Sequence, residues 1–376
     1  MSGVILNNET KSVIDRKDFQ TLFDALGAEG YRISGPTVRD NAVVYDEIGS
    51  TEELPVGWSD RQEGGSYRLV KNKKPTLFGF ILGPYTWKKL LYPPTKKIWE
   101  TRKSGHSFEI VEPESKPIKQ AFIGVRPCEL KAIGIQDKVL RDGQHSDPDY
   151  GALRRNLFIV AVNCTDPGNN CFCASMNSGP GVSDGFDLAL TEMIEGKKHY
   201  FVVEAGSRAG KKILEKIPHR PAEPVEVEAA GKAVEKAVSK MGRSLDMKGL
   251  KEILYDGFDS HRWSEIAKRC LTCGNCTMVC PTCFCCNVED TTNLGGDRAE
   301  RLRCWDTCYS VDFSYIHGGS IRSTDYSRYR QWLMHKIAYW QDQFGTPGCV
   351  GCGRCITWCP VGIDITEEAG VIREKA

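Results

Sequence analysis

The amino-acid sequence predicts an α/β or α+β N-terminal region followed by a helical, cysteine-rich C-terminal domain. Two observations lead to this division. Short strand and helix patterns alternate along the first part of the chain, and the 17 cysteines are distributed unevenly. None precedes Cys128, whereas four lie within residues 128–173 and thirteen within residues 270–359. We therefore expect an α/β domain over residues 1–210, a charged helical linker over 211–262 and a second domain over 263–376.

The first predicted element is a helix over residues 18–26, where apolar side chains recur at helical spacing. Short strands are expected to follow at residues 31–33, 42–45 and 67–70. The segment GPYTWKKLLYPPTKKIWE, residues 83–100, mixes aromatic side chains with lysines. We interpret it as a solvated helix with a half-buried face; the alternative is a surface on which a partner protein docks.

Two apolar strands are predicted further along the chain, at residues 120–125 and 157–162. Each is followed closely by a cysteine, Cys128 and Cys164. This arrangement resembles an open α/β sheet that presents loops at the carboxyl edge of its strands. We expect these cysteines to lie at that edge.

The next elements are predicted to be a helix over residues 188–194 and a strand over residues 200–204. Residues 211–261 are charged and carry the proline-rich segment PHRPAEP, followed by helical patterns. We interpret them as the linker between the two domains.

Charge and hydropathy restrict the possible functions. Lys and Arg (50) nearly balance Asp and Glu (49), so no basic field recruits nucleic acid or an anionic membrane. The apolar runs are too short to cross a bilayer, and residues 1–19 become charged before the core of a signal peptide forms. We therefore expect a cytoplasmic protein, whose reduced cysteines serve metal or redox chemistry rather than disulfides.

Two cysteine runs share the pattern C-x2-C-x2-C-x3-C followed by proline. The first contains Cys270, Cys273, Cys276 and Cys280, and the second contains Cys349, Cys352, Cys355 and Cys359. This is the ligand pattern of bacterial-type [4Fe–4S] ferredoxins, in which the fourth cysteine of each run binds the other cluster. The spacing therefore predicts one cluster bound by Cys270, Cys273, Cys276 and Cys359, and a second bound by Cys349, Cys352, Cys355 and Cys280.

Three other interpretations of these cysteines are weaker. Structural zinc sites use paired C-x2-C knuckles rather than an unbroken run of four thiols. The spacing of Cys276, Cys280 and Cys283 matches that of radical-SAM proteins, but it overlaps a complete ferredoxin pattern. The adjacent Cys285 and Cys286 resemble the paired cysteines of non-cubane clusters, but Asn287 stands where a glycine usually follows.

The segment between the two runs ends in an amphipathic pattern. Its apolar side chains, spaced as on one face of a helix, are Trp332, Leu333, Ile337, Trp340 and Phe344. This pattern favours a ferredoxin-type domain in which helices pack around the two clusters.

A third set of thiols lies in the N-terminal region. Cys128, Cys164, Cys171 and Cys173 follow two strands and occupy one loop, and we expect them to bind a third [4Fe–4S] cluster. The alternative is that some of them are small buried apolar residues. The remaining cysteines are Cys283, Cys285, Cys286, Cys304 and Cys308. Of these, Cys285, Cys286, Cys304 and Cys308 are candidate ligands for a further metal site, and the sequence leaves their role open.

Four stretches occur in an order that resembles one protein family. They are GVRPCELKAIGIQD, NCTDPGNNCFC, CLTCGNCTMVCPTCFC and CVGCGRCITWCPVGID. The chain resembles the iron–sulfur beta subunit of cytosolic sulfhydrogenases and the corresponding iron–sulfur subunit of anaerobic sulfite reductase, and it is related to chains of heterodisulfide reductase-linked bifurcating complexes. The resemblance implies an electron-transfer subunit placed between a catalytic subunit on one side and an NAD(P)H-linked flavoprotein subunit on the other. It also strengthens the expectation of a cluster at the N-terminal cysteines.

No catalytic constellation is recognisable in the sequence, so we expect a relay of single electrons without catalytic residues of its own. The glycines at 179, 181 and 185 do not match a dinucleotide-binding loop. Two alternatives remain. One is an enzyme that binds its substrate at an unusual cluster on Cys285, Cys286, Cys304 and Cys308. The other is an iron–sulfur sensor or binding module.

Overall fold

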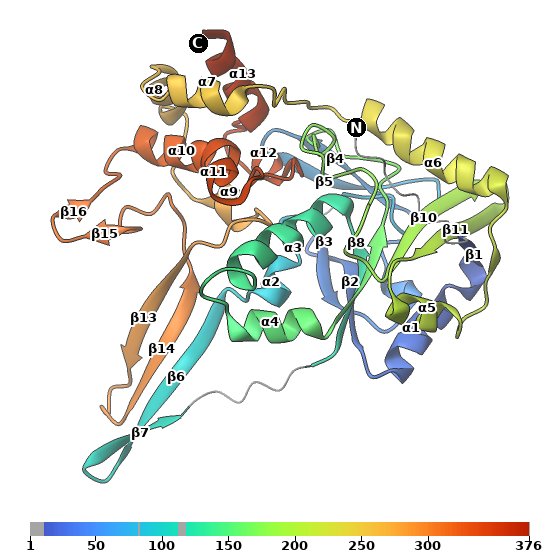
Figure 1. Ribbon diagram of the computed structural model, residues 1–376, viewed down its shortest axis with the longest axis horizontal. Coiled ribbons are helices and arrows are strands. Elements are labelled where there is room, and N and C mark those ends of the chain that lie inside the picture. Colours follow the sequence, from blue (N-terminus) through green and yellow to red (C-terminus); the bar gives the residue numbers. More distant parts are fainter. Residues whose placement is uncertain (1–10, 82, 112–117, 376) are drawn as a thin grey trace.

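An eight-stranded sheet organises the first part of the chain (Figure 1). The computed structural model describes residues 11–81, 83–111 and 118–375. Residues 1–10, which carry part of the prediction about the N-terminus, lie outside the described residues. In spatial order the strands are β12 (Arg220–Pro221), β1 (Ser12–Asp15), β11 (Lys198–Ala205), β10 (Leu188–Glu195), β9 (Leu157–Val162), β8 (Gln120–Val125), β2 (Arg32–Arg39) and β3 (Ala42–Glu47).

The four central strands of this sheet are parallel. β2 pairs with β8, β8 with β9, and β9 with β10, all in parallel register. Their carboxyl ends therefore meet at one edge, where open α/β sheets place their functional loops. β8 and β9 are almost completely buried, as their continuous apolar sequences predict. The strands predicted at residues 120–125 and 157–162 are therefore confirmed.

Helices cover both faces of the sheet. Side chains alternate along the strands, so each face presents its apolar residues to a separate core. Ile14, Phe201 and Val203 share one core with α1 (Gln20–Ala28) and α5 (Arg208–Leu214). Their neighbours Val13, Tyr200 and Val202 form another core with Ala230 of α6 (Pro224–Ser239). Helix α3 (Pro127–Leu140) follows β8 directly, and α4 (Pro148–Arg155) precedes β9.

The prediction of a helix over residues 188–194 is wrong, because this segment forms strand β10. It forms an antiparallel hairpin with β11 over its full length, from Leu188 paired with Ala205 to Glu195 paired with Lys198. A short apolar run fits either a helix or a buried strand, and here pairing with β9 and β11 determines the outcome. The strand expected at residues 200–204 is confirmed as part of β11.

The helix predicted within residues 83–100 is also largely wrong. Only α2 (Lys88–Leu91) is helical, and β6 (Thr95–Ser104) begins after Pro93 and Pro94. Proline cannot continue a helix, and the following residues pair instead with β14 (Arg298–Trp305) from the distant C-terminal region. A partner strand that lies so far away in sequence left no local signal.

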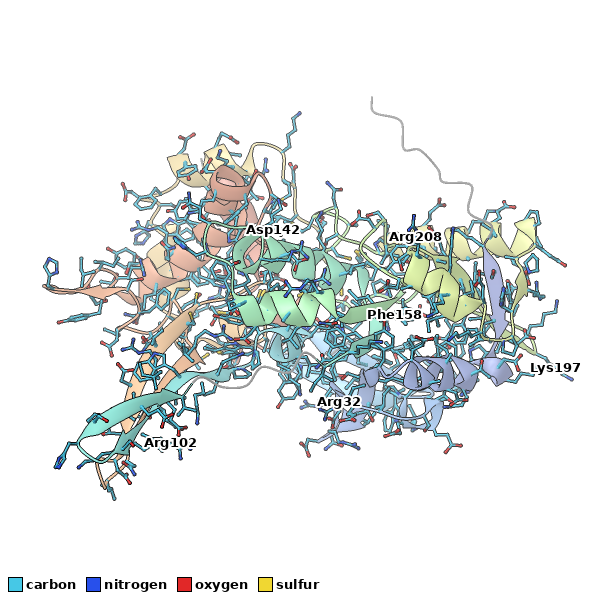
Figure 2. All side chains as sticks on the ribbon, turned by 60° about the horizontal axis from the view of Figure 1, so that its bottom comes forward. Arg32, Arg102, Asp142, Phe158, Lys197 and Arg208 are labelled. Atoms are coloured by element: carbon cyan, nitrogen blue, oxygen red, sulfur yellow. The ribbon has the colours of Figure 1, made fainter. Side chains whose placement is uncertain are left out.

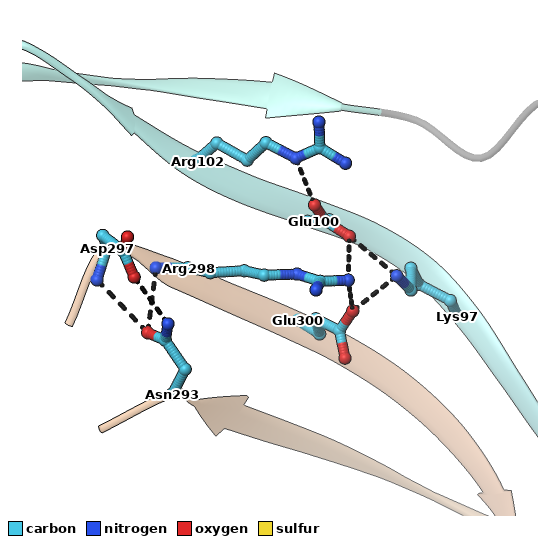
Figure 3. A network of polar contacts seen from close by, with 7 residues as sticks. All are labelled: Lys97, Glu100, Arg102, Asn293, Asp297, Arg298 and Glu300. Carbon is cyan, nitrogen blue, oxygen red and sulfur yellow. Dashed lines mark hydrogen bonds and ion pairs between the residues drawn. The ribbon is translucent and has the colours of Figure 1, made fainter. Parts of the chain in front are cut away.

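β6 and β14 are the central strands of a four-stranded ribbon that projects from the body of the molecule (Figure 1). Its outer strands are β7 (Ser107–Val111) and β13 (Cys286–Thr292). The buried Glu100 joins the central strands, since it accepts from Lys97 at 2.7 Å and from Arg298 at 2.8 Å (Figure 3). Arg102 of this ribbon and Lys197 of the β10–β11 turn lie at opposite ends of the molecule (Figure 2).

The C-terminal region combines helices with strands. Its helices are α7 (Leu250–Asp256), α8 (Arg262–Ala267), α9 (Asn275–Met278), α10 (Asp325–Met334), α11 (Trp340–Phe344), α12 (Arg354–Thr357) and α13 (Ile365–Lys375). A π-helical turn, His335–Tyr339, joins α10 to α11. Trp332, Leu333, Ile337 and Trp340 are buried, as the amphipathic pattern predicts, whereas Phe344 is only partly buried. Besides this helical stretch, the segment between the cysteine runs contains β13, β14, β15 (Tyr315–Ile316) and β16 (Gly319–Ser320).

Further pairing outside the main sheet involves β4 (Trp58–Glu63) and β5 (Ser66–Lys71), which form an antiparallel hairpin. It contains the strand predicted at residues 67–70, and the amide of Gly65 in its turn donates to the carbonyl of Ile356 in α12 at 3.1 Å. None of the helices in the described part of the chain is long and apolar enough to cross a membrane.

A buried ion pair fastens the sheet to the second cysteine run. Arg354 of α12 donates to Glu129 of α3 at 2.7 Å, and both side chains are at most 4% exposed. Tyr45 of β3 also donates to Glu129. A further bond, from the Asn170 amide to Thr357 at 2.8 Å, joins the same regions. These contacts hold the N-terminal loops against the C-terminal cysteines.

We predict that Glu129→Gln destabilises the metal-loaded protein by about 3–5 kcal/mol, because it leaves the buried Arg354 guanidinium without a counter-charge. Denaturant unfolding under anaerobic conditions measures the change. The matched control is Glu47→Gln, since Glu47 pairs with Arg32 at the surface, where both side chains are 54% exposed. The control should cost at most about 1 kcal/mol. Equal losses in the two variants would contradict the structural role of the buried pair.

Candidate iron–sulfur centres

The first cysteine run meets the last cysteine of the second run at one pocket. Cys270, Cys273, Cys276 and Cys359 line it together with Tyr309 and Trp332. These are the four residues that the spacing predicts for one cluster. Cys273 is exposed, whereas Cys270, Cys276 and Cys359 are partly buried.

A second pocket gathers the other predicted set. Cys280, Cys349, Cys352 and Cys355 line it, together with Phe172, Trp332 and Lys336. The fourth cysteine of each run thus lies with the first three cysteines of the other run. Local structure explains this exchange. The short helices α9 and α12 end just before Cys280 and Cys359, so each of these residues starts a new segment directed at the other set.

Backbone amides donate to cysteine sulfurs in a similar way in both runs. Thr272 donates to Cys270 and Gly351 donates to Cys349, each at 3.4 Å. Both donors have positive φ angles, 51° for Thr272 and 62° for Gly351. The amide of Ile363 also donates to Cys359 at 3.3 Å. Such bonds stabilise negative charge on sulfur, as expected of thiolates that bind a metal cluster.

A buried lysine contacts the second set. Lys336 is 4% exposed, and its ammonium donates to Cys280 Sγ at 3.3 Å and to Thr282 Oγ1 at 2.7 Å. It belongs to the π-helical turn, a type of helix irregularity that is common at functional sites. Nothing in the local sequence identified this residue, because Cys280 lies more than fifty positions earlier in the chain.

The N-terminal thiols also come together. Cys128 is the second residue of α3, which follows β8; Cys164 follows β9, and Cys171 and Cys173 lie in the loop after it. Burial and then the charges of Cys171 and Cys164 raise the pKa of Cys173, and burial and then the charge of Cys173 raise the pKa of Cys128, so the four thiols are neighbours. Parallel pairing of β8 with β9 explains the arrangement, because it places both strand ends at the same edge.

This N-terminal set touches the second cysteine run. Cys171 Sγ lies 3.9 Å from the carbonyl oxygen of Cys352. The amide of Phe172 donates to the carbonyl of Gly351 at 2.8 Å. The buried guanidinium of Arg126 lies 3.8 Å from Cys164 Sγ. The N-terminal thiols and the second pocket are therefore direct neighbours.

Burial raises the pKa of most of these thiols when they bind nothing, whereas a hydrogen bond with Cys283 and the charge of Lys336 hold the pKa of Cys280 well below its usual value. Burial raises the pKa of Cys171 and of Cys349 to about 12, so both would be neutral thiols near pH 7. Binding to iron is what makes such buried groups thiolates. Among the described residues no three His, Cys, Asp or Glu side chains are placed to bind a single metal ion. A cubane fits these sets better, since its irons stand between the thiolates and keep them apart.

The remaining five cysteines lie on and around strands β13 and β14. The thiol of Cys308 lowers the pKa of Cys285, and the thiol of Cys280 raises the pKa of Cys283, so each pair of side chains is adjacent. Cys286, by contrast, is exposed at the start of β13, and Cys304 lies within β14, opposite Asn287. The candidate group of Cys285, Cys286, Cys304 and Cys308 is thus spread over strands β13 and β14 and the segments that flank them. The spacing of the cysteines did not indicate that Cys283 lies beside Cys280 of the second set, while Cys286 is exposed.

Comparison with known proteins agrees with this geometry. Residues 269–363 match the 4Fe-4S dicluster domain family, which implies two [4Fe–4S] clusters. The chain is 30% identical to sulfhydrogenase 2 subunit beta of Pyrococcus furiosus over 359 residues, which cover 95% of this chain and 96% of that protein. No solved structure matches the chain.

The family resemblance seen in the sequence is thereby confirmed. It extends over nearly the whole chain, so it includes the N-terminal sheet as well as the cysteine runs. The chain belongs to the sulfhydrogenase beta-subunit family and is an iron–sulfur electron-transfer subunit of an oxidoreductase complex.

Proposed function

We propose that the chain carries single electrons between the catalytic subunit of a cytoplasmic oxidoreductase and its NAD(P)H-linked flavoprotein subunit. The catalytic subunit would be of the hydrogenase, sulfite or sulfur reductase, or heterodisulfide reductase type. The name of the Pyrococcus relative, a sulfhydrogenase subunit, supports the hydrogenase and sulfur reductase types.

Three thiol sets would bind the clusters. Set A is Cys270, Cys273, Cys276 and Cys359; set B is Cys280, Cys349, Cys352 and Cys355; set C is Cys128, Cys164, Cys171 and Cys173. A [4Fe–4S] cluster with four cysteine ligands has no open iron and exchanges one electron at a time. The protein itself positions the thiolates, donates amide hydrogen bonds to sulfur and controls exposure to water.

The observation that carries the proposal is the consecutive contact between these sets. Set A adjoins set B, since Cys355 of set B also lines the pocket of set A. Set B adjoins set C through Cys352 and Cys171. The sets therefore form a continuous row from C through B to A, as a relay requires.

One end of this row faces solvent. Cys273 of set A is exposed, and the apolar side chains of Leu271 and Val361 beside it are 59% and 39% exposed. Exposed apolar side chains next to a redox centre suit contact with a partner protein. We propose that one partner exchanges electrons at set A.

The three-cluster assignment predicts the result of removing one ligand from set C. Cys171→Ala should lower the iron content by about four atoms per chain relative to the unaltered protein, since a cubane contains four irons. Iron and acid-labile sulfide are measured after anaerobic purification, together with EPR spectra of the reduced protein. Cys304→Ala is the control and should keep the full content. An unchanged iron content in Cys171→Ala would show that set C binds no cluster.

Lys336 should raise the reduction potential of the cluster at set B, because a buried positive charge beside Cys280 favours the more negative, reduced state. Lys336→Met should therefore lower this potential by on the order of 60 mV, a tenfold change in a one-electron equilibrium. An EPR-monitored redox titration measures it. Lys248→Met is the surface control, and a potential that stays constant in Lys336→Met would exclude this electrostatic role.

A further inference from the structure

One face of helix α10 follows the two pockets of the C-terminal cysteines. Tyr329 and Trp332 lie three positions apart in this helix, a spacing that places both side chains on the same face. Tyr329 lines the pocket of set A, and Trp332 lines the pockets of both sets. Lys336, in the π-helical turn that continues α10, donates to Cys280 of set B. The three side chains are therefore ordered along the row of thiols, from set A to set B.

Two polar groups on this face have no hydrogen-bond partner. Tyr329 is 2% exposed and Trp332 is 5% exposed, and solvent does not reach the polar atom of either side chain. Within the described ranges of the chain, no protein atom pairs with the hydroxyl of Tyr329 or with the indole Nε1–H of Trp332. The two rings lie 5.6 Å apart, and such an aromatic contact does not replace a hydrogen bond to either group.

The missing partners indicate that something else occupies the pockets. A buried N–H or O–H group without an acceptor loses its hydrogen bonds to water and gains none in return, so folded proteins pair nearly all such groups. Both groups therefore require an acceptor that the polypeptide does not supply.

The walls of the pockets restrict what this acceptor can be. Apart from the thiols they are largely apolar, with Leu271 and Ile363 beside set A and Phe172 and Ile365 beside set B. A buried water molecule needs about two to four polar partners, and walls of this kind do not provide them. The sulfur atoms of iron–sulfur clusters do accept hydrogen bonds, and the dicluster family places two clusters in this domain.

We propose that α10 donates two hydrogen bonds to the clusters. The hydroxyl of Tyr329 donates to a sulfur of the cluster at set A, and the indole N–H of Trp332 donates to a sulfur of one of the two clusters between which it stands. Each bond stabilises the more negative, reduced state, so it raises the reduction potential of the cluster that accepts it. This role rests on the assignment of sets A and B to clusters, and it does not depend on which partner supplies the electrons.

Phenylalanine variants of the complete chain test the proposal, because they remove the donor and keep an aromatic ring. Tyr329→Phe should lower the potential of the cluster at set A, and Trp332→Phe should lower that of one of the two clusters. The expected shift is about tenfold in the one-electron equilibrium constant, or about 59 mV. Anaerobic redox titrations monitored by EPR measure both potentials.

Trp263→Phe is the matched control. Trp263 is 1% exposed in the same apolar core, but its Nε1 already donates to the carbonyl of Gly257 at 2.9 Å. This variant should leave both potentials unchanged. Full iron content with unchanged potentials in Tyr329→Phe and Trp332→Phe would overturn the hydrogen bonds and leave the cluster assignment intact. Absence of the iron of sets A and B from the unaltered protein would contradict both.

Pulsed EPR of the unaltered protein provides a measurement that does not depend on variant folding. Tryptophan labelled with ¹⁵N in the indole ring should give a ¹⁵N hyperfine coupling to a reduced cluster, since Trp332 lines both cysteine pockets. Trp332→Phe should remove this coupling, and Trp263→Phe should retain it. A missing coupling in the unaltered protein, or one that persists in Trp332→Phe, would overturn the role of Trp332.

Discussion

The close approach of two backbone segments determines the arrangement of the cofactor sites. Gly351 and Gly353 of the second cysteine run lie directly on the loop of residues 170–173. A Cβ atom at Gly351 would stand 2.6 Å from the carbonyl oxygen of Phe172, and one at Gly353 would stand 2.4 Å from that of Asn170. Both glycines also have positive φ angles, 62° and 75°. Only glycine satisfies both conditions, and this contact makes set C a neighbour of set B.

The first cysteine run does not have a glycine at the position that corresponds to Gly351. Its residue equivalent to Gly351 is Thr272, which adopts a positive φ angle and makes the same kind of amide bond to sulfur. Thr272 is partly buried, and Cys273 beside it is exposed. The two runs therefore share the geometry that binds a cluster, and they differ where the second run is packed against the sheet.

Charge compensation distinguishes the buried centres from the exposed one. Arg126 approaches Cys164 and Lys336 approaches Cys280, both as buried cations. Set A instead has an exposed cysteine, and water can solvate part of its charge. Iron–sulfur clusters carry net negative charge, so a buried cluster needs cations that an exposed one obtains from solvent.

The sequence by itself determined the features that depend on local spacing. The two cysteine runs follow from the reach of a short loop around a cluster, and the strands before Cys128 and Cys164 follow from continuous apolar runs. Their placement at one sheet edge also followed, since parallel strands end together. Tertiary structure alone decided that Leu188–Glu195 is a strand, because β9 and β11 supply its hydrogen bonds. It also brought Lys336 to Cys280, since that contact joins residues that are distant in the chain.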